Sequence, residues 1–418
     1  MFWLREHDMA INYNAAIPLN MFLQKRAGSI SLTTQQNIGQ LIRNLFSNSE
    51  QGFAYDINDL STLFQDAAGT TPVTAAGQPV GLVLDKSKGL VVGPERLTNG
   101  DFGAGSTGWA VVGTDATHIV TFSNGTMRYQ GDTSTPVLSA QQLNTLIVGK
   151  WYEVTMSISN YISGALKSDG LGGIVLPSSV GTYKLRAMAT STTFNILRNT
   201  PNVDITIDSI SVRELVGNHA YQTTSASRPL LQRNATTGAY YLAFDGTDDF
   251  LVTNSIDFTA TDKISLFAGV RKLSDATIGM LCEFSADLGS NNGVFYLGAP
   301  ATAGNGSITF NSKGTSFAAT IAASVFAPVS VVVTGYANIA APSSAIRVNG
   351  VFKSSNLASQ GSVKYGNYPL YIGRRGGTTL PFSGHIYSLI GIGRLTTDAE
   401  TLALEKSIAK NTGVTLSV

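Results

Sequence analysis

Three aspartates crowd one short stretch of the chain, "YLAFDGTDDFL" at 241–251. Asp245, Asp248 and Asp249 supply hard oxygen atoms close together, which is the donor type that calcium prefers. The same stretch is also typical of a tight turn between two strands, in which aspartate side chains accept hydrogen bonds from the backbone and a glycine takes a positive φ. We favour the turn, with calcium as the alternative.

The chain contains no recognisable catalytic motif. H-E-x-x-H, G-x-S-x-G and paired Cys/His ligands are absent, and the four histidines are scattered. None of the eight glutamates begins an E-x-D-x-x-E pattern, although a retaining glycosidase needs two carboxylates about 5 Å apart. Cys282 sits in the apolar run "IGMLCEF" and is expected to be a buried small hydrophobe. We therefore expect no enzymatic activity.

Aromatic side chains are the better candidates for a binding site, because pyranose rings stack on their flat faces. The alternative is burial, because a tryptophan that follows a glycine turn or begins a strand more often packs in the core. The candidates between residues 90 and 216 are Trp109, Tyr129, Trp151 and Tyr161.

A second group of candidates lies in "YGNYPLYIGRRGGTTLPF", which places Tyr368 and Arg374 near a loop. An arginine there can bind the carboxylate of an acidic sugar. The alternative is that the arginine is simply solvated.

Composition predicts a chain of many short strands. Hydrophobic residues make up 43%, charged residues only 13%, and there are 43 glycines. A chain of 418 residues is too long for one core, so we expect two or three domains. The net charge of +1, without a basic block, indicates neither a nucleic-acid nor an anionic-membrane partner and is compatible with a neutral sugar.

The N-terminus, "MFWLREHDMAINYN", carries acidic residues early and has neither a long apolar segment nor a cleavage site. It does not resemble a signal peptide, and translation can begin at Met1 or Met9. No run of about 18 apolar residues occurs, so no membrane insertion is expected. We expect the protein to be made in the cytoplasm and to remain soluble there; if it acts outside a cell, a route other than the secretory pathway carries it.

One helix is predicted within residues 31–48, where Thr33 and Gln36 form a capping box. Its apolar stripe either packs on the following domain or serves as an assembly helix between copies of the chain. The stripe consists of Ile38, Leu41, Ile42, Leu45 and Phe46.

The segment from 90 to 215 reads as a β-sandwich, because apolar and polar residues alternate from Trp151 to Ile158 and no helical pattern is convincing. Near its end, Ile205 and Ile207 keep one phase of alternation while Ile210 and Val212 keep the other. This shift predicts a β-bulge at 208–209.

Two elements are predicted in the last third of the chain. "SAIRVNGVFKSS" at 344–355 predicts a hairpin with Asn349 and Gly350 in its turn. "TTDAETLALEKSIAKNTG" predicts a terminal helix, with Thr397 and Glu400 as a capping box and Gly413 as the C-cap.

Several of these stretches carry a resemblance. "YLAFDGTDDFL", "IRVNGVF", "FSGHIYSLIGIG" and the closing helix resemble the concanavalin-A-like (laminin-G-type) jelly roll. "GFAYDINDLSTLFQDAAGTTPVTAAGQPVGLVLDKS" and "GNHAYQTTSASRPLL" are similar to the lead-in of such domains in tailed-phage virion proteins. In those proteins the two pieces commonly run together, whereas here a long segment separates them.

The resemblance therefore implies an insertion, which succeeds where the ends of the inserted domain lie close together. Residues 52–89 plus 217–418 would form one discontinuous jelly roll, and 90–216 an inserted β-sandwich. Residues 1–51 would be a segment for virion attachment and oligomerisation.

The inserted segment resembles the galactose-binding-like sandwich of carbohydrate-binding modules, through "LTNGDFGAGSTGW" and "ITIDSISVREL". This resemblance places Asp208 at a structural calcium position of such modules, so Ca²⁺ is the one cofactor considered. The alternative is that Asp208 caps the predicted bulge.

Together the resemblances imply a structural protein of a tailed-phage virion, namely a tail fibre or appendage protein that binds a host surface polysaccharide. Its partners would be other virion proteins and copies of itself, by analogy a trimer, because weak lectin sites need several copies to hold a surface. The alternatives are a purely architectural capsid decoration or tail-connecting protein, and a polysaccharide depolymerase.

Overall fold

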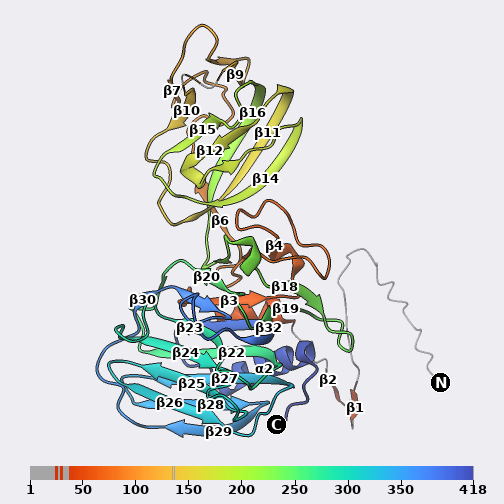
Figure 1. The fold of residues 1–418 in the computed structure, drawn as a ribbon, viewed down its shortest axis with the longest axis vertical. Coiled ribbons are helices and arrows are strands. Elements are labelled where there is room, and N and C mark those ends of the chain that lie inside the picture. The colour runs from red at the N-terminus through yellow and green to blue at the C-terminus, as the bar shows by residue number, and fades with distance from the viewer. Residues whose placement is uncertain (1–23, 27–28, 32–36, 134, 136, 418) are drawn as a thin grey trace, which may run out of the picture.

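The computed structural model describes residues 24–26, 29–31, 37–133, 135 and 137–417. They form two β-sandwiches, with residues 92–215 above and the remainder below in Figure 1. The prediction of a mainly β chain with two β-sandwich domains is confirmed. The predicted capping box at Thr33 and Gln36, and most of the N-terminal segment, lie outside the described residues.

The larger sandwich consists of a nine-stranded and an eight-stranded antiparallel sheet around one core. The nine-stranded sheet has the order β26 (Phe317–Ala322), β25 (Ile308–Lys313), β24 (Val294–Gly298), β23 (Met280–Phe284), β31 (Leu370–Ile372), β20 (Leu251–Thr253), β17 (Ala220–Tyr221), β5 (Leu82–Val83), β4 (Leu63–Phe64). The eight-stranded sheet has the order β18 (Leu230–Arg233), β19 (Tyr240–Asp245), β32 (Ser383–Ile392), β22 (Lys263–Lys272), β27 (Val329–Asn338), β28 (Ser343–Val348), β29 (Val351–Asn356), with β3 (Gly52–Asp56) paired to β32.

The upper sandwich has a core of its own between a five-stranded and a six-stranded sheet. The five-stranded sheet has the order β13 (Ile174–Val175), β12 (Leu166–Ser168), β15 (Phe194–Arg198), β10 (Ser139–Gln142), β7 (Ala110–Val112). The six-stranded sheet has the order β14 (Gly181–Met188), β11 (Trp151–Ser163), β16 (Val203–Leu215), β9 (Thr126–Gly131), β8 (Ile119–Ser123), with β6 (Val92–Glu95) paired to β16.

Small elements complete the chain. Two short antiparallel pairs join β1 (Gln24–Arg26) to β2 (Ser29–Ser31) and β21 (Ile256–Asp257) to β30 (Asn367–Tyr368). The helices of the described residues are α1 (Ile38–Leu45), α2 (Asp398–Thr412) and three short 3₁₀ turns at Leu60–Thr62, Asp169–Leu171 and Ser225–Ser227. Within the described part of the chain, no helix has the length and apolarity that crossing a bilayer requires.

The upper sandwich enters and leaves the lower one between two neighbouring strands. β5 precedes it and β17 follows it, and the two strands pair antiparallel, with Val83 opposite Ala220. The strands that lead in and out therefore lie side by side, which is the geometry that an insertion requires. We refer to residues 92–215 as the inserted sandwich.

Three local predictions are confirmed. Ser157 pairs with Ser209 and Ile158 with Ile207, so Asp208 is the extra residue of a β-bulge. The hairpin of β28 and β29 turns through Asn349 and Gly350, both at positive φ. Helix α2 has the predicted capping box of Thr397 and Glu400, and Gly413 ends it at a φ of 74°.

Helix α1 corrects the expectation of an assembly helix. It is capped by Asn37, whose side chain accepts a hydrogen bond from the Gln40 amide. Its stripe of Ile38, Ile42, Leu45 and the adjacent Phe46 is buried against α2 and the outside of the eight-stranded sheet, with Leu41 partly buried beside them. The apolar stripe is therefore covered by the chain's own sandwich.

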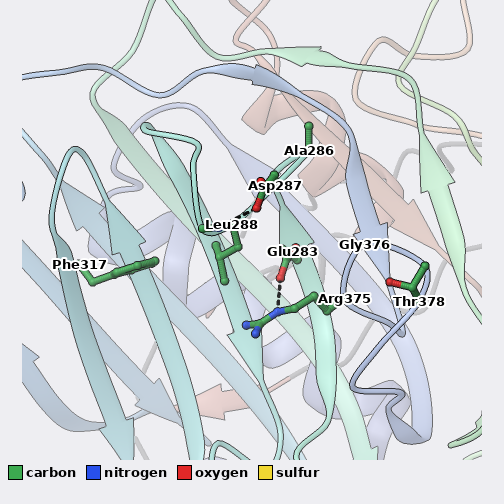
Figure 2. A pocket seen from close by; sticks show the side chains of 9 residues that line it. Glu283, Ala286, Asp287, Leu288, Phe317, Arg375, Gly376 and Thr378 are labelled. Atoms are coloured by element: carbon green, nitrogen blue, oxygen red, sulfur yellow. Dashed lines mark hydrogen bonds and ion pairs between the residues drawn. The ribbon is translucent and has the colours of Figure 1, made fainter.

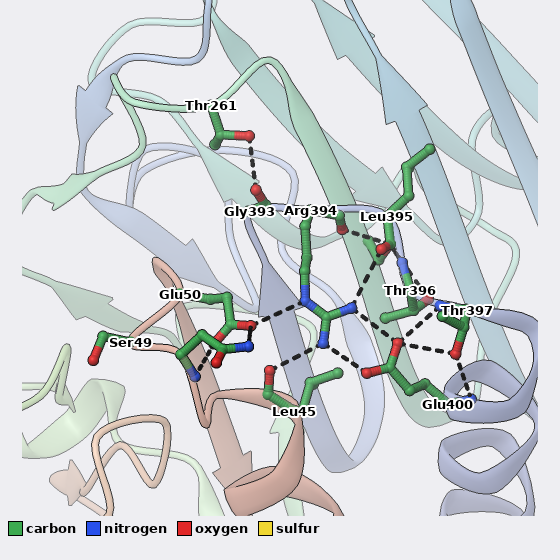
Figure 3. A network of polar contacts seen from close by, with 12 residues as sticks. Leu45, Ser49, Glu50, Thr261, Gly393, Arg394, Leu395, Thr396, Thr397 and Glu400 are labelled. Atoms are coloured by element: carbon green, nitrogen blue, oxygen red, sulfur yellow. Dashed lines mark hydrogen bonds and ion pairs between the residues drawn. The ribbon is translucent and has the colours of Figure 1, made fainter.

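A single arginine joins α1 to α2. The Arg394 guanidinium donates to the Leu45 carbonyl at 3.1 Å, to Glu50 at 3.2 Å and to both carboxylate oxygens of Glu400 at 2.7 and 2.9 Å (Figure 3). The hydrogen bond from Arg394 lowers the pKa of Glu400 to about 2. The end of α1 is thus tied to the start of α2 inside one chain.

The inserted sandwich docks on the larger one through an apolar junction. Trp151 and Leu215 of the inserted sandwich pack with Phe64, Leu82 and Leu84 of the larger one. The Arg186 guanidinium lies 4.8 Å from the centre of the Phe64 ring. The Asn254 amide crosses the junction to donate to the Gly149 carbonyl.

The two motifs that resemble a single phage-type lead-in meet at this junction. His219 of "GNHAYQ" accepts a hydrogen bond at Nδ1 from the Asp85 amide of "LDKS", at 2.9 Å. The Asp85 carboxylate accepts from the amides of Ala54, Ser87 and Asn218, each at 2.8 Å. Complete burial lowers the pKa of His219 to about 4, so the imidazole is neutral.

Candidate functional site

One ladder of side chains crosses the outer face of the nine-stranded sheet, the face that points away from the shared core. Its members lie opposite one another on successive strands, one on each strand. We call this ladder the outer row, and it consists of Ala319, Asn311, Tyr296, Glu283, Tyr371, Val252, Tyr221, Leu82 and Phe64.

The outer row has a covered end and an open end. At the covered end, Tyr221, Leu82 and Phe64 pack in the apolar junction with the inserted sandwich. At the open end the residues from Tyr371 to Ala319 alternate with core residues such as Phe295, so they point away from the core. The open end is the part of this face that a ligand can reach.

A pocket of about 450 Å³ opens at this end of the row. Glu283 lines it together with the loop of residues 286–289 and with Phe317, Arg375 and Thr378. Figure 2 shows Phe317 on one side of the pocket and Arg375 with Thr378 on the other. The volume is within the range of small-molecule sites, which is about 300–1,000 Å³.

An ion pair forms the polar part of the pocket. The Arg375 Nε donates to Glu283 Oε2 at 2.8 Å, and the guanidinium carbon lies 5.5 Å from the centre of the Tyr296 ring. Burial raises the pKa of Glu283, while the hydrogen bond from Arg375 opposes that rise. Arg375 is thereby held through Nε, and its terminal NH₂ groups remain available to a ligand, since neither donates to another of the described residues.

Aromatic rings form the other part. Phe317, on edge strand β26, is 45% exposed, and its ring meets the Tyr296 ring edge-on at 6.3 Å. The Lys313 ammonium lies 5.0 Å from the centre of the Phe317 ring. Below them the Asn311 amide donates to the Tyr296 hydroxyl at 2.6 Å. The exposed ring is thus supported by fixed neighbours, which favours a preformed stacking surface.

The loop over the pocket is held by two side chains. Lys313 donates to the Asn291 carbonyl at 2.6 Å. Asp287 accepts from the Ser290 hydroxyl at 2.7 Å and from the Gly289 amide at 2.9 Å, and these bonds lower its pKa. The charged residues that line the pocket are Arg375, Glu283 and Asp287. Lys313 does not line it, but its buried ammonium holds the adjoining loop and supplies the second positive charge, so the charges in and next to the pocket balance.

The structure does not bring the predicted sugar-binding residues together. Trp109 is 7% exposed, lies beside Phe102 and Phe194, and donates from Nε1 to the Asn99 carbonyl at 3.1 Å. Tyr129 is fully buried, and its hydroxyl donates to the Leu138 carbonyl. Both rings belong to the core of the inserted sandwich and have no free face for a sugar, which corrects their assignment.

The other predicted residues are dispersed. Trp151 is 4% exposed because it fills the junction, which removes its ring faces from solvent. Tyr161 is 38% exposed at the far end of β11. Tyr368 is half-buried beside Phe284, and Arg374 donates to the Thr378 carbonyl at 2.9 Å, next to the pocket but not lining it. Sugar binding by Tyr161, Tyr368 and Arg374 stays a prediction.

The two predicted calcium positions differ. The carboxylates of Asp245, Asp248 and Asp249 lie within 4.8 Å of one another, and burial, together with the other two carboxylates, raises the pKa of Asp249 to about 6. The Asp245 side chain accepts from the Thr247 amide at 2.7 Å, as the predicted turn requires. Around Asp208 no such group of ligands occurs among the described residues, so calcium binding there stays a prediction.

Sequence reasoning missed Glu283, Tyr296 and Phe317. One signal was present, since Glu283 is a charged residue inside the apolar run "IGMLCEF". A glutamate at such a place must find a partner, because burying an unpaired carboxylate is costly. The partner, Arg375, follows β31, which lies next to β23 in the sheet but far from it in the sequence.

No protein-family model and no curated protein matches the chain. Among solved structures, the CBM40 of the Ruminococcus gnavus IT-sialidase, bound to α2,3-sialyllactose, is 18% identical over 35% of this chain and 83% of that one, with a TM-score of 0.29. The binding domain of botulinum neurotoxin serotype D is 10% identical over 45% of this chain and 48% of that one, with a TM-score of 0.33. Likenesses at this level assign neither a family nor a function.

Proposed function

We propose that the protein binds a glycan in the pocket at the open end of the outer row. The observation that carries the proposal is the exposed Phe317 ring facing the Arg375–Glu283 pair across a cavity of about 450 Å³. An aromatic face for a sugar ring and fixed polar groups for its hydroxyls are the elements of a carbohydrate site. The balanced charge of the pocket favours a neutral sugar.

We further propose that this binding serves a tailed-phage virion, as part of a tail fibre or appendage that adheres to host surface polysaccharide. The support is the sequence resemblance of "LVLDKS" and "GNHAYQ" to the lead-in of such virion proteins. One shallow site binds weakly, so adhesion requires several copies, and a trimer is the proposed assembly. The assembly contact must then lie elsewhere than the buried stripe of α1.

Two variants test the glycan site. Phe317→Ala removes the exposed ring, and Phe352→Ala is its control, because Phe352 is an exposed phenylalanine on β29 that does not line the pocket. The full chain of each variant is displayed on multivalent beads and its binding to an array of bacterial surface polysaccharides is measured. We expect Phe352→Ala to bind as the native chain does. We expect Phe317→Ala to bind with about tenfold lower affinity, equivalent to about 1.4 kcal/mol. Equal binding by both variants, or no binding of the native chain to any glycan, would reject the site.

The virion role has a separate test. Antibodies to the purified chain should label intact phage particles and block their adsorption to host cells. Labelling without any effect on adsorption would instead support the architectural alternative, a capsid decoration or tail-connecting protein.

One observation favours a second candidate function, a polysaccharide depolymerase. Glu283, whose pKa is raised, and Asp287, whose pKa is lowered, line the same pocket. Carboxyl groups with opposite shifts can act as acid and base in glycoside cleavage. Release of reducing ends from a bound polysaccharide, abolished by Glu283→Gln, would establish this function, and its absence from every bound polysaccharide would exclude it.

A further inference from the structure

Arg375 brings two unused donors to the pocket at the open end of the outer row, which we call the Phe317 pocket. Its side chain lines this pocket and is 32% exposed. Only Nε has a partner among the described residues, and the two terminal nitrogens remain accessible to solvent. Figure 2 shows them directed towards the side of the pocket on which Phe317 lies.

Glu283 fixes the direction of these donors. Its side chain is only 2% exposed, and its Oε2 accepts from Arg375 Nε at 2.8 Å. The guanidinium carbon also lies 5.5 Å from the centre of the Tyr296 ring, which restricts the arginine from another direction. Because a guanidinium is planar and rigid, a fixed Nε also fixes the terminal nitrogens. Glu283 is therefore placed to act on a ligand through Arg375, as a positioning residue.

Asp287 adds acceptors to the same pocket. Its carboxylate is exposed, and it accepts from the Gly289 amide at 2.9 Å and from the Ser290 hydroxyl at 2.7 Å. Each carboxylate oxygen has a further lone pair, which can accept a hydrogen bond from a ligand hydroxyl. The negative charge of Asp287 also disfavours an acidic ligand beside it. A ligand that both donates and accepts through hydroxyl groups suits Asp287 and Arg375 together.

The fork of Arg375 indicates how the hydroxyl groups are arranged. Two parallel N–H donors require two oxygen acceptors side by side, and two hydroxyls on adjacent ring carbons are a neutral pair of this kind. We propose that the Phe317 pocket selects a neutral sugar with two adjacent free hydroxyls, which accept hydrogen bonds from Arg375 as held by Glu283. The sugar ring would stack on Phe317. This inference rests on the proposed glycan binding and adds the feature of the sugar that is recognised.

Small neutral sugars test the ligand, with the full native chain. The methyl glycosides of glucose, galactose and mannose are titrated by ligand-detected NMR, followed by each monodeoxy derivative of the best binder. Loss of either of two adjacent hydroxyls should weaken binding about tenfold, because a guanidinium donor then lacks its acceptor. Loss of any other hydroxyl should weaken binding about twofold or less.

Two results of this titration would overturn the inference. Equal effects at every position would remove the adjacent pair of hydroxyls and leave the proposed glycan binding intact. No binding by any of the three glycosides would also overturn it. The proposed function fails as well only if the polysaccharide array shows no binding.

A pH profile tests the positioning role of Glu283. The ligand is uncharged, and burial raises the pKa of Glu283, so this carboxyl takes up a proton before Asp287, whose pKa is lowered by its hydrogen bonds. Lys313 and Tyr296 are the other titratable side chains beside Arg375, and lysine and tyrosine do not titrate in acid. From pH 7 to pH 4.5 the native chain should lose affinity by at least about twofold. Glu283→Gln should bind more weakly than the native chain at pH 7, and equally at both pH values.

Glu405→Gln is the matched control. Glu405 is a fully buried carboxylate that pairs at 2.9 Å with a partly exposed arginine, Arg347, on the other sheet. This variant should bind as the native chain does at both pH values. An unchanged affinity of the native chain in acid, or equal effects of Glu405→Gln and Glu283→Gln, would show that Glu283 does not position the donors. If Glu283→Gln does not fold, the pH profile of the native chain decides.

Discussion

The two ends of the outer row belong to the same face of one sheet and differ in what covers them. At the covered end Phe64, Leu82 and Tyr221 lie under Trp151 and form a small core between two domains. At the open end Glu283 and Tyr296 are held by Arg375, a residue of the same domain. A single sheet face thus serves as a docking surface over one part and as a candidate binding surface over the other.

This contrast explains how an inserted domain can be accommodated without loss of a site. Docking needs apolar surface, which stabilises by about 25 cal/mol per Å² buried. Binding needs fixed polar groups that remain accessible. The outer row separates these requirements along its length. Substitutions at its covered end should therefore lower mainly stability, and substitutions at its open end mainly binding.

The largest effect is expected at the covered end. Trp151→Ala should lower the free energy of unfolding by about 3–5 kcal/mol, because it empties a buried site between the domains. Phe317→Ala at the open end should cost about 1 kcal/mol or less, since that ring is half-exposed. Urea denaturation followed by circular dichroism measures both. Similar losses for the two variants would mean that the ends do not differ as described.

The junction should also respond to acid through His219, whose pKa falls from 6.5 to about 4 on burial. The unfolded chain binds this proton more readily than the folded one, so stability is lost as the pH falls from about 6.5 towards 4 and is fully present above that window. The loss is on the order of 3 kcal/mol. The free energy of unfolding of the native chain and of His219→Gln should be measured at pH 7 and pH 4.5. Between these pH values the native chain should lose more stability than His219→Gln, because only the native chain has this histidine to protonate.

His118 provides a control of opposite sign for this measurement. The hydrogen bond to Asp115 raises the pKa of His118, so its contribution is present at low pH and is lost as the pH rises through its folded pKa. His118→Gln should therefore remove stability mainly in acid. If both histidine variants shift stability in the same direction, the neutral state assigned to His219 is incorrect.

A smaller effect is expected from Arg375→Ala at the open end. It leaves the Glu283 carboxylate buried without its partner, which should cost about 2 kcal/mol at pH 7, below the range for fully buried pairs because Arg375 is partly exposed. The cost should shrink at lower pH, where Glu283 takes up a proton. Arg374→Ala is the matched control, because Arg374 donates to carbonyl oxygens and not to a carboxylate.

The smallest effect is expected from salt. Because the charges at the Phe317 pocket cancel, raising NaCl from about 50 to about 500 mM should change the affinity for a bound glycan by about twofold or less. A tenfold fall would show instead that Arg375 binds an acidic sugar. Repeating the titration with a neutral and an acidic polysaccharide separates these outcomes.

Local sequence signals predicted much of this fold because their causes are local. The turn at Asn349-Gly350 needs two residues at positive φ, and the box at Thr397 and Glu400 needs two side chains three residues apart. The bulge at Asp208 was likewise visible as a change of phase. Each of these features is decided within a few residues, so the sequence alone was sufficient.

The candidate site was not predictable in the same way, because it depends on strand order. Glu283 and Arg375 meet only because β31 lies next to β23. Trp151 was a candidate for sugar binding because the local sequence around an aromatic residue at the start of a strand does not indicate whether its side chain faces solvent, a core or another domain. The assembly helix failed for the same reason, since its stripe gave no indication that α2 would cover it.

The position of the insertion also has a consequence for the order of folding during synthesis. β3 begins the larger sandwich but pairs with β32, so Gly52 cannot pair until Ile392 has been synthesised. In the same way β5 cannot pair with β17 until the inserted sandwich has been synthesised. The inserted sandwich has its partners within 92–215 and can therefore be complete while the larger one still has unpaired edges. We expect the ribosome-bound chain to carry a finished domain beside an unfinished one, and chaperones to be needed most for its earliest strands.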